Sequence, residues 1–177
     1  VRFMGDIAYF VTFRQVDPLF SVDLSDPKNP KIIGALKIPG FSDYLFPFGE
    51  NLLLGIGQDA DEETGRTKGM KLSMFDTKNP SDVKESAKAI LDVFSSDALF
   101  SHKSSLISYD RNLIGFDVYN DGRGYMLYSF ENGKFIKRAQ YDLGDTSLYV
   151  RGLYIGDLFY IVTGTKVLSI DINTFKV

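Results

Sequence analysis

A short motif that recurs four times along the chain limits the folds that the chain can adopt. Residues 5–12 (GDIAYFVT) reappear as residues 156–163 (GDLFYIVT), and two weaker copies lie between them. The four copies are anchored on Asp6, Asn51, Asn112 and Asp157, with spacings of 45, 61 and 45 residues. In each copy a turn-forming residue is followed at once by an apolar, β-prone run, which indicates a strand that leaves a tight turn.

A second marker indicates that each repeat holds more than one strand. An acidic residue ends another β-prone run in every copy, at Asp23, Asp76, Glu131 and Asp171. In the first two repeats a turn-forming pair with proline follows, and proline forces the preceding residue out of the helical region. The pattern predicts four strands per repeat, with repeats at residues 1–40, 41–95, 96–144 and 145–177, the last of them incomplete.

Four-stranded units at this spacing predict an all-β fold, a partial β-propeller of about four blades with four antiparallel strands each. A solenoid would need shorter repeats, and a flat meander would leave long exposed edges. The fourth repeat stops where its outermost strand should begin, so we expect the chain to be an excerpt of a larger ring. We therefore expect open sheet faces, and either oligomers or pairing with the missing blades.

One segment permits a different structure. On a helix, the side chains of Val83, Ala87, Ile90, Leu91 and Phe94 would form one apolar stripe. The repeat instead favours a strand over residues 83–91. The same reasoning places the innermost strand of the third repeat at residues 101–107, which puts His102, the single histidine, beside the central channel in a structural role.

Composition excludes several classes of function. The chain of 177 residues has a net charge of −3, and its basic residues are scattered, which argues against a nucleic-acid partner. It has no cysteine, which excludes disulfides, thiolate metal sites and cysteine nucleophiles. No apolar run approaches the roughly 18 residues of a membrane span. The Gly-x-Gly pieces at 55–57 and 122–124 lack the full nucleotide-binding pattern.

Several longer motifs resemble those of a known family. Residues 1–6 (VRFMGD), 13–20 (FRQVDPLF), 36–45 (LKIPGFSDYL) and 55–59 (GIGQD) are similar to secreted bacterial and archaeal proteins with a C-terminal β-propeller distantly related to WD repeats. The resemblance implies a protein that is secreted or attached to the cell envelope, and it implies no particular activity. It also implies a histidine where Phe46 stands here.

The candidate site residues lie in loops between second and third strands, which share one face of a propeller. In the insertion at residues 58–69, Asp59, Asp61 and Glu63 alternate as the ligands of a calcium loop do, although Thr64 stands where such a loop needs glycine. The alternative is a solvated acidic turn. No other cofactor is predicted.

The equivalent loop of the first repeat carries Arg14 and Gln15. Arg14 presents a guanidinium to an anionic or sugar ligand in one interpretation, and pairs with a carboxylate of a neighbouring blade in the other.

The sequence therefore favours a non-catalytic extracellular binding or scaffolding module that contacts a protein or a glycan through the loop-rich face. One alternative is a glycan-active hydrolase or lyase, which needs two carboxylates about 5–9.5 Å apart at the channel mouth. Asp43 and Asp59 are candidates for that pair. A third interpretation is a calcium-stabilised structural spacer.

Overall fold

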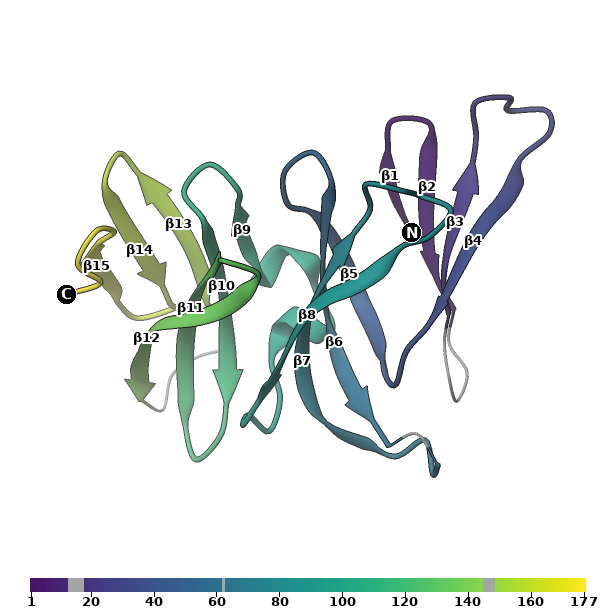
Figure 1. Cartoon of the computed structure of the whole chain (residues 1–177). Coiled ribbons are helices and arrows are strands. Elements are labelled where there is room, and N and C mark those ends of the chain that lie inside the picture. The colour runs from purple at the N-terminus through teal and green to yellow at the C-terminus, as the bar shows by residue number, and fades with distance from the viewer. Residues whose placement is uncertain (13–17, 62, 145–148) are drawn as a thin grey trace. The chain divides into compact units, whose positions relative to one another are not determined.

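The computed structural model describes residues 1–12, 18–61, 63–144 and 149–177. They form antiparallel sheets that follow one another along the sequence (Figure 1). The chain divides into two compact units, Val1–Asp92 and Val93–Val177. In each sheet every strand pairs with its neighbour in the sequence. The all-β fold predicted from the repeat is confirmed, and each sheet falls within one of the four predicted repeats.

The first unit holds two four-stranded sheets. The strands of the first sheet are β1 (Arg2–Met4), β2 (Ile7–Val11), β3 (Pro18–Asp23) and β4 (Lys31–Lys37). Those of the second are β5 (Phe41–Pro47), β6 (Leu52–Ala60), β7 (Thr67–Asp76) and β8 (Lys84–Leu91). The two sheets pack on a shared core that contains Tyr9, Leu19, Leu45, Leu53, Phe75 and Val83.

The second unit begins with two short 3₁₀ helices and continues with two sheets. The helices are η1 (Asp97–Leu99) and η2 (His102–Ser104). The first sheet contains β9 (Leu106–Ser108), β10 (Leu113–Tyr119), β11 (Arg123–Glu131) and β12 (Lys134–Gly144), and the second contains β13 (Arg151–Ile155), β14 (Leu158–Val162) and β15 (Val167–Asp171). Their shared core includes Tyr125, Leu127, Val150, Phe159, Ile161 and Ile170.

The repeated anchors form the tight turns between first and second strands. Gly5 and Gly156, each one residue before an anchor, have φ angles of +59° and +58°, and Asn112 has a φ of +49°. Glycine and asparagine adopt this left-handed region at low cost, which explains why the motif repeats turn formers at this point.

Within each unit the turns alternate between two edges of the sheets. In the second unit the β10–β11 turn lies at the lower edge of Figure 1, whereas the β9–β10 and β13–β14 turns lie at the upper edge. In the first unit the β6–β7 turn is at the lower edge and the β5–β6 turn at the upper edge.

Three local predictions are settled by the structure. Residues 84–91 form strand β8, so the helical interpretation of this segment is wrong. The predicted strand at 101–107 is also wrong over its first part, because residues 102–104 form η2 and the strand begins at Leu106. His102 is exposed on η2. Half of the predicted insertion at 58–69 is strand, because β6 runs to Ala60 and β7 begins at Thr67.

None of the helices among the described residues is long and apolar enough to cross a membrane.

Candidate functional site

The β6–β7 turn brings the three predicted calcium ligands to one cavity. Asp59, Asp61 and Glu63 line a cavity of about 330 Å³. The remaining lining residues are Pro39, Ala60, Lys68 and Lys88. The cavity therefore carries two lysines beside its three carboxylates, and this mixture of charges is not visible in the spacing of the acidic residues.

Two of the three carboxylates in this cavity, those of Asp59 and Asp61, already form ion pairs. Asp61 Oδ1 accepts hydrogen bonds from the main-chain N–H of Glu63 at 3.1 Å and of Thr64 at 2.9 Å. Its Oδ2 lies 2.8 Å from Lys68 Nζ, and this contact is the main reason that the pKa of Asp61 is lowered. Asp59 is 9% exposed and lies 3.9 Å from Lys88 Nζ.

Among the residues that the structure describes, no three His, Cys, Asp or Glu side chains gather closely enough to hold a metal ion. Calcium binding by Asp59, Asp61 and Glu63 stays a prediction, and it requires Asp61 to release Lys68. Arg14 and Gln15 lie at positions 13–17, outside the described residues.

A buried lysine supports one wall of this cavity. Lys71 on β7 is 1% exposed, and its Nζ donates a hydrogen bond to the carbonyl of Pro39 at 2.5 Å. Burial lowers the pKa of Lys71, and the nearby charges of Glu85 and Asp59 oppose that shift. Because Pro39 lies between β4 and β5, Lys71 ties the connection between two sheets to the third strand of the second sheet.

A larger cavity lies at the corresponding edge of the second unit. It has a volume of about 720 Å³ and is formed by the β10–β11 turn and the end of β12. The lining residues are Val118, Asn120, Asp121, Gly122, Arg123, Gly124, Gln140, Tyr141, Asp142 and Gly144. Asp121 and Asp142 are exposed, so the cavity presents two carboxylates and two side-chain amides to solvent.

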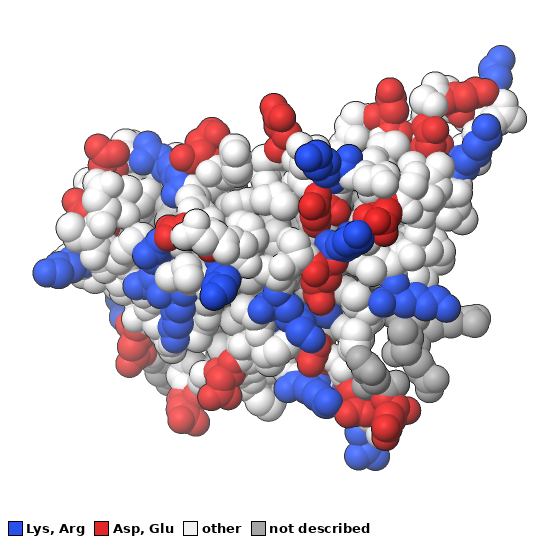
Figure 2. Space-filling model, in the orientation of Figure 1, with Lys and Arg blue, Asp and Glu red and all other residues white. Residues whose placement is uncertain are grey.

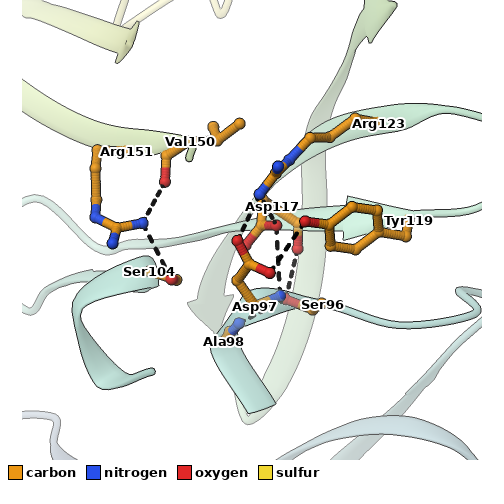
Figure 3. Close-up of polar contacts among 9 residues, drawn as sticks. All are labelled: Ser96, Asp97, Ala98, Ser104, Asp117, Tyr119, Arg123, Val150 and Arg151. Carbon is orange, nitrogen blue, oxygen red and sulfur yellow. Dashed lines mark hydrogen bonds and ion pairs between the residues drawn. The ribbon is translucent and has the colours of Figure 1, made fainter. Parts of the chain in front are cut away.

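Arg123 is held rigidly in the wall of this cavity. It is 6% exposed, and its Nη2 donates to Asp97 Oδ2 at 2.5 Å and to Asp117 Oδ2 at 3.0 Å (Figure 3). The Tyr119 hydroxyl donates to Asp97 Oδ1 at 3.0 Å, and the Arg123 guanidinium lies 4.6 Å from the Tyr119 ring centroid. A cation over an aromatic face adds attraction to the two ion pairs.

The segment before η1 is fastened to the same cluster. Ser96 Oγ donates to the carbonyl of Asp117 at 2.6 Å and accepts from the main-chain N–H of Ala98 at 3.0 Å. Ser96 therefore caps η1 and places Asp97 beside Arg123 (Figure 3).

The pair of carboxylates on Arg123 is unsuited to glycoside hydrolysis. Burial raises the pKa of Asp117, the charge of Asp97 raises it further, and Arg123 opposes both. Asp117 has no exposed surface, so it cannot contact a substrate. The two aspartates hold Arg123 in place instead. Asp43 and Asp59, the carboxylates that the sequence offered for catalysis, line two separate cavities.

Sequence reasoning missed the Asp97–Asp117–Arg123 cluster. Its members come from η1, β10 and β11, and 26 residues separate Asp97 from Arg123. The only local signal was an arginine between two glycines at 122–124, a pattern that is too short to specify a partner.

Comparisons with known proteins agree with this architecture. The family model described as a β-propeller domain matches residues 1–175. An uncharacterised protein of Archaeoglobus fulgidus is 37% identical over 177 residues, 99% of this chain and 26% of its own length. An uncharacterised protein of Methanocaldococcus jannaschii is 35% identical over 176 residues, with the same two coverages. The chain thus spans about a quarter of the length of these curated relatives.

A solved structure that contains Dbp5, Nup159 and Gle1 of S. cerevisiae includes a chain with 15% identity and a TM-score of 0.41. The match covers 89% of the present chain and 44% of that one, and a likeness at this level has no bearing on function. The family match over residues 1–175 and the four successive antiparallel sheets lead to one conclusion: the chain belongs to the β-propeller domain family.

Proposed function

We propose that this chain is part of a non-catalytic binding module outside the cell, which contacts a glycan or a protein through the edge that carries the second-to-third-strand turns. The observation that supports this proposal is the cavity of about 720 Å³ at the β10–β11 turn. Its volume lies within the roughly 300–1,000 Å³ that is usual for small-ligand sites.

The chemistry of this cavity favours a hydroxyl-rich ligand such as a glycan. Carboxylates and amides accept and donate hydrogen bonds to neighbouring hydroxyls, and Asp121, Asp142, Asn120 and Gln140 supply both groups. Gly122 and Gly144 are exposed and leave the main chain accessible to a ligand.

An exposed aromatic ring lies beside the same turn. The main-chain N–H of Phe94 donates to Asn120 Oδ1 at 2.8 Å and to the carbonyl of Tyr119 at 2.9 Å. The Phe94 side chain is 90% exposed. A ring in this position offers a stacking surface to a sugar next to a residue that lines the cavity.

A nucleic-acid ligand does not fit the charge of the chain. On the face seen in Figure 2, basic and acidic side chains are interspersed, and the net charge is −3. Nucleic-acid-binding domains instead cluster lysine and arginine on one surface. Secretion or attachment to the cell envelope belongs to this proposal and rests on the resemblance of the sequence motifs.

A glycan array probed with the purified chain tests the proposal. We expect binding that falls at least about tenfold in Asp121→Ala and in Phe94→Ala, since a lost charge-assisted hydrogen bond or ring contact costs about 1.4 kcal/mol or more. The matched control is Asp110→Ala, which removes an exposed carboxylate from the β9–β10 turn at the opposite edge. Equal binding by Asp121→Ala and Asp110→Ala would exclude this cavity as the glycan site.

Pairing with further blades is a second part of the proposal. Leu153, Ile155, Leu158 and Val167 are exposed on one face of the β13–β15 sheet, while Phe159 and Ile161 on the other face belong to the core. An exposed apolar face of this kind favours packing against another sheet. We expect Leu158→Lys to reduce self-association of the chain in light scattering, and unchanged association would exclude this face.

A further inference from the structure

Strand β5 contains a bulge that moves one carboxylate out of the ladder. Ser42 pairs with Gly57 and Tyr44 pairs with Ile56, so Asp43 has no residue opposite it on β6. Bulges re-aim side chains, and they are over-represented next to functional sites. The bulge turns Asp43 towards a cavity of about 200 Å³ in the first unit.

This cavity is formed between the two sheets of the first unit. Its walls come from the start of β1 and the end of β2 on one side, and from residues 42–45 of β5 on the other. Arg2 is fixed in the wall, because its Nε donates to the carbonyl of Leu45 at 2.7 Å and its guanidinium lies 5.8 Å from the Phe46 ring centroid.

The carboxyl group of Asp43 lacks the partners that a buried carboxylate needs. Its Oδ2 is buried and has no hydrogen-bond partner among the described residues. None of the ion pairs in the described part of the chain includes Asp43. Burial raises the pKa of Asp43 to about 6, opposed by a hydrogen bond with its own main-chain N–H.

A ligand that donates to Oδ2 would recover the free energy that burial costs this group. An unpaired buried charge is unfavourable, and a charged donor compensates it better than a neutral one because charge-assisted hydrogen bonds are roughly twice as strong. The cavity is smaller than the roughly 300–1,000 Å³ of sites for drug-sized ligands, so it suits a single small ring or side group.

We propose that Asp43 is the recognition group of a binding site for a small primary ammonium ligand that is about as large as an amino sugar. The site is separate from the cavity at the β10–β11 turn and does not depend on the function proposed for it. The other ionisable side chains among the residues that line the cavity are those of Arg2 and Tyr44.

Three sugars with the same ring size but different charges test whether the site requires a positively charged ligand. Titration of the chain with glucosamine, glucose and glucuronate, followed by NMR, should give binding of glucosamine at pH 7.5 and at least about tenfold weaker binding of the other two. Binding of glucosamine should weaken about tenfold at pH 5, because a carboxyl with a pKa of about 6 is then mostly protonated.

Two variants separate Asp43 from the other charges. Asp43→Asn keeps the shape of the side chain and should remove both the preference for glucosamine and its dependence on pH. Asp6→Asn, which neutralises an exposed carboxylate in the β1–β2 turn, should bind glucosamine as the parent chain does. Glucosamine binding that is unchanged in Asp43→Asn, or glucose binding as tight as glucosamine binding, would overturn the proposal.

A direct measurement on the parent chain keeps the proposal testable if Asp43→Asn fails to fold. The ¹³C resonance of the Asp43 carboxyl should titrate at a lower pH in the presence of glucosamine than in its absence, because an ammonium ligand favours the charged carboxylate. A titration that glucosamine leaves unchanged excludes the site. Loss of glycan binding in Asp121→Ala has no influence on this result.

Discussion

The hydroxyl of Tyr125 on β11 lies directly against Gly152 on β13, so closely that a Cβ added at Gly152 would overlap it. Tyr125 has no exposed surface, and its ring centroid lies 5.6 Å from that of Phe159. A Cβ at Gly115 would also stand 2.9 Å from the same hydroxyl. Two glycines from neighbouring sheets therefore make room for one buried tyrosine, and this fit joins the two sheets of the second unit.

Replacing this glycine should loosen the contact between the two sheets. We expect Gly152→Ala to lower the free energy of unfolding by about 1–3 kcal/mol, because a buried ring cannot move aside without disturbing its neighbours. Urea denaturation measures the effect. Gly122→Ala is the matched control, since a Cβ there meets nothing within 4 Å, and it should change stability by less than about 0.5 kcal/mol. Equal stability of the two variants would contradict the account of Tyr125.

Removing Arg123 should destabilise the fold strongly. In Arg123→Met the fully buried Asp117 loses its compensating charge, so we expect a loss of about 3–5 kcal/mol in chemical denaturation. Adding Asp117→Asn should restore part of this loss, because it removes the uncompensated charge. Arg111→Met is the control: Arg111 pairs with Asp157, which is 80% exposed, so the cost should stay near 1 kcal/mol or below. A similar loss of unfolding free energy in Arg123→Met and Arg111→Met would show that burial of the ion pair has no special effect.

Asp43 should make stability depend on pH in the direction opposite to most aspartates. Its folded-state pKa of about 6 lies above the usual value of 3.8, so the folded chain holds the proton over the range between them. The favourable contribution is therefore present below about pH 4 and lost as the pH rises through about 6. We expect Asp43→Asn to match the parent chain near pH 4 and to exceed its stability by about 1–3 kcal/mol above pH 7. Parallel pH profiles of the two proteins would show that the carboxyl is not buried in solution.

Calcium tests the predicted site at Asp59, Asp61 and Glu63. Because Asp61 already accepts hydrogen bonds within its own turn and pairs with Lys68, we expect millimolar calcium to shift the melting temperature by less than about 1 °C. Thermal unfolding with calcium and with magnesium measures the shift. A calcium-specific rise that Asp61→Asn abolishes would instead establish the metal site and favour the calcium-stabilised spacer.

The repeat predicted the strands because tight turns depend on residues next to each other in the chain. Gly5, Asn112 and Gly156 have positive φ angles at an anchor or one residue before it, and each is followed by a strand within two residues. At residues 84–91 the repeat was a better guide than the local apolar stripe, since pairing with β7 decides the conformation of this segment. Residues 102–104 broke the pattern, because they form η2 where the repeat predicts a strand.

The sequence by itself determined the number of sheets and the order of the strands within each sheet. These features follow from short-range turn chemistry and from a motif that is repeated four times. Only the tertiary structure decided which charges meet. Arg123 joins Asp97 and Asp117 across 26 and 6 residues, and a bulge leaves Asp43 unpaired in a cavity between two sheets. The Arg123 contacts depend on the pairing of β10 with β11 and on the position of η1, and the Asp43 cavity depends on how one sheet packs on the next. No spacing within a single strand records these arrangements.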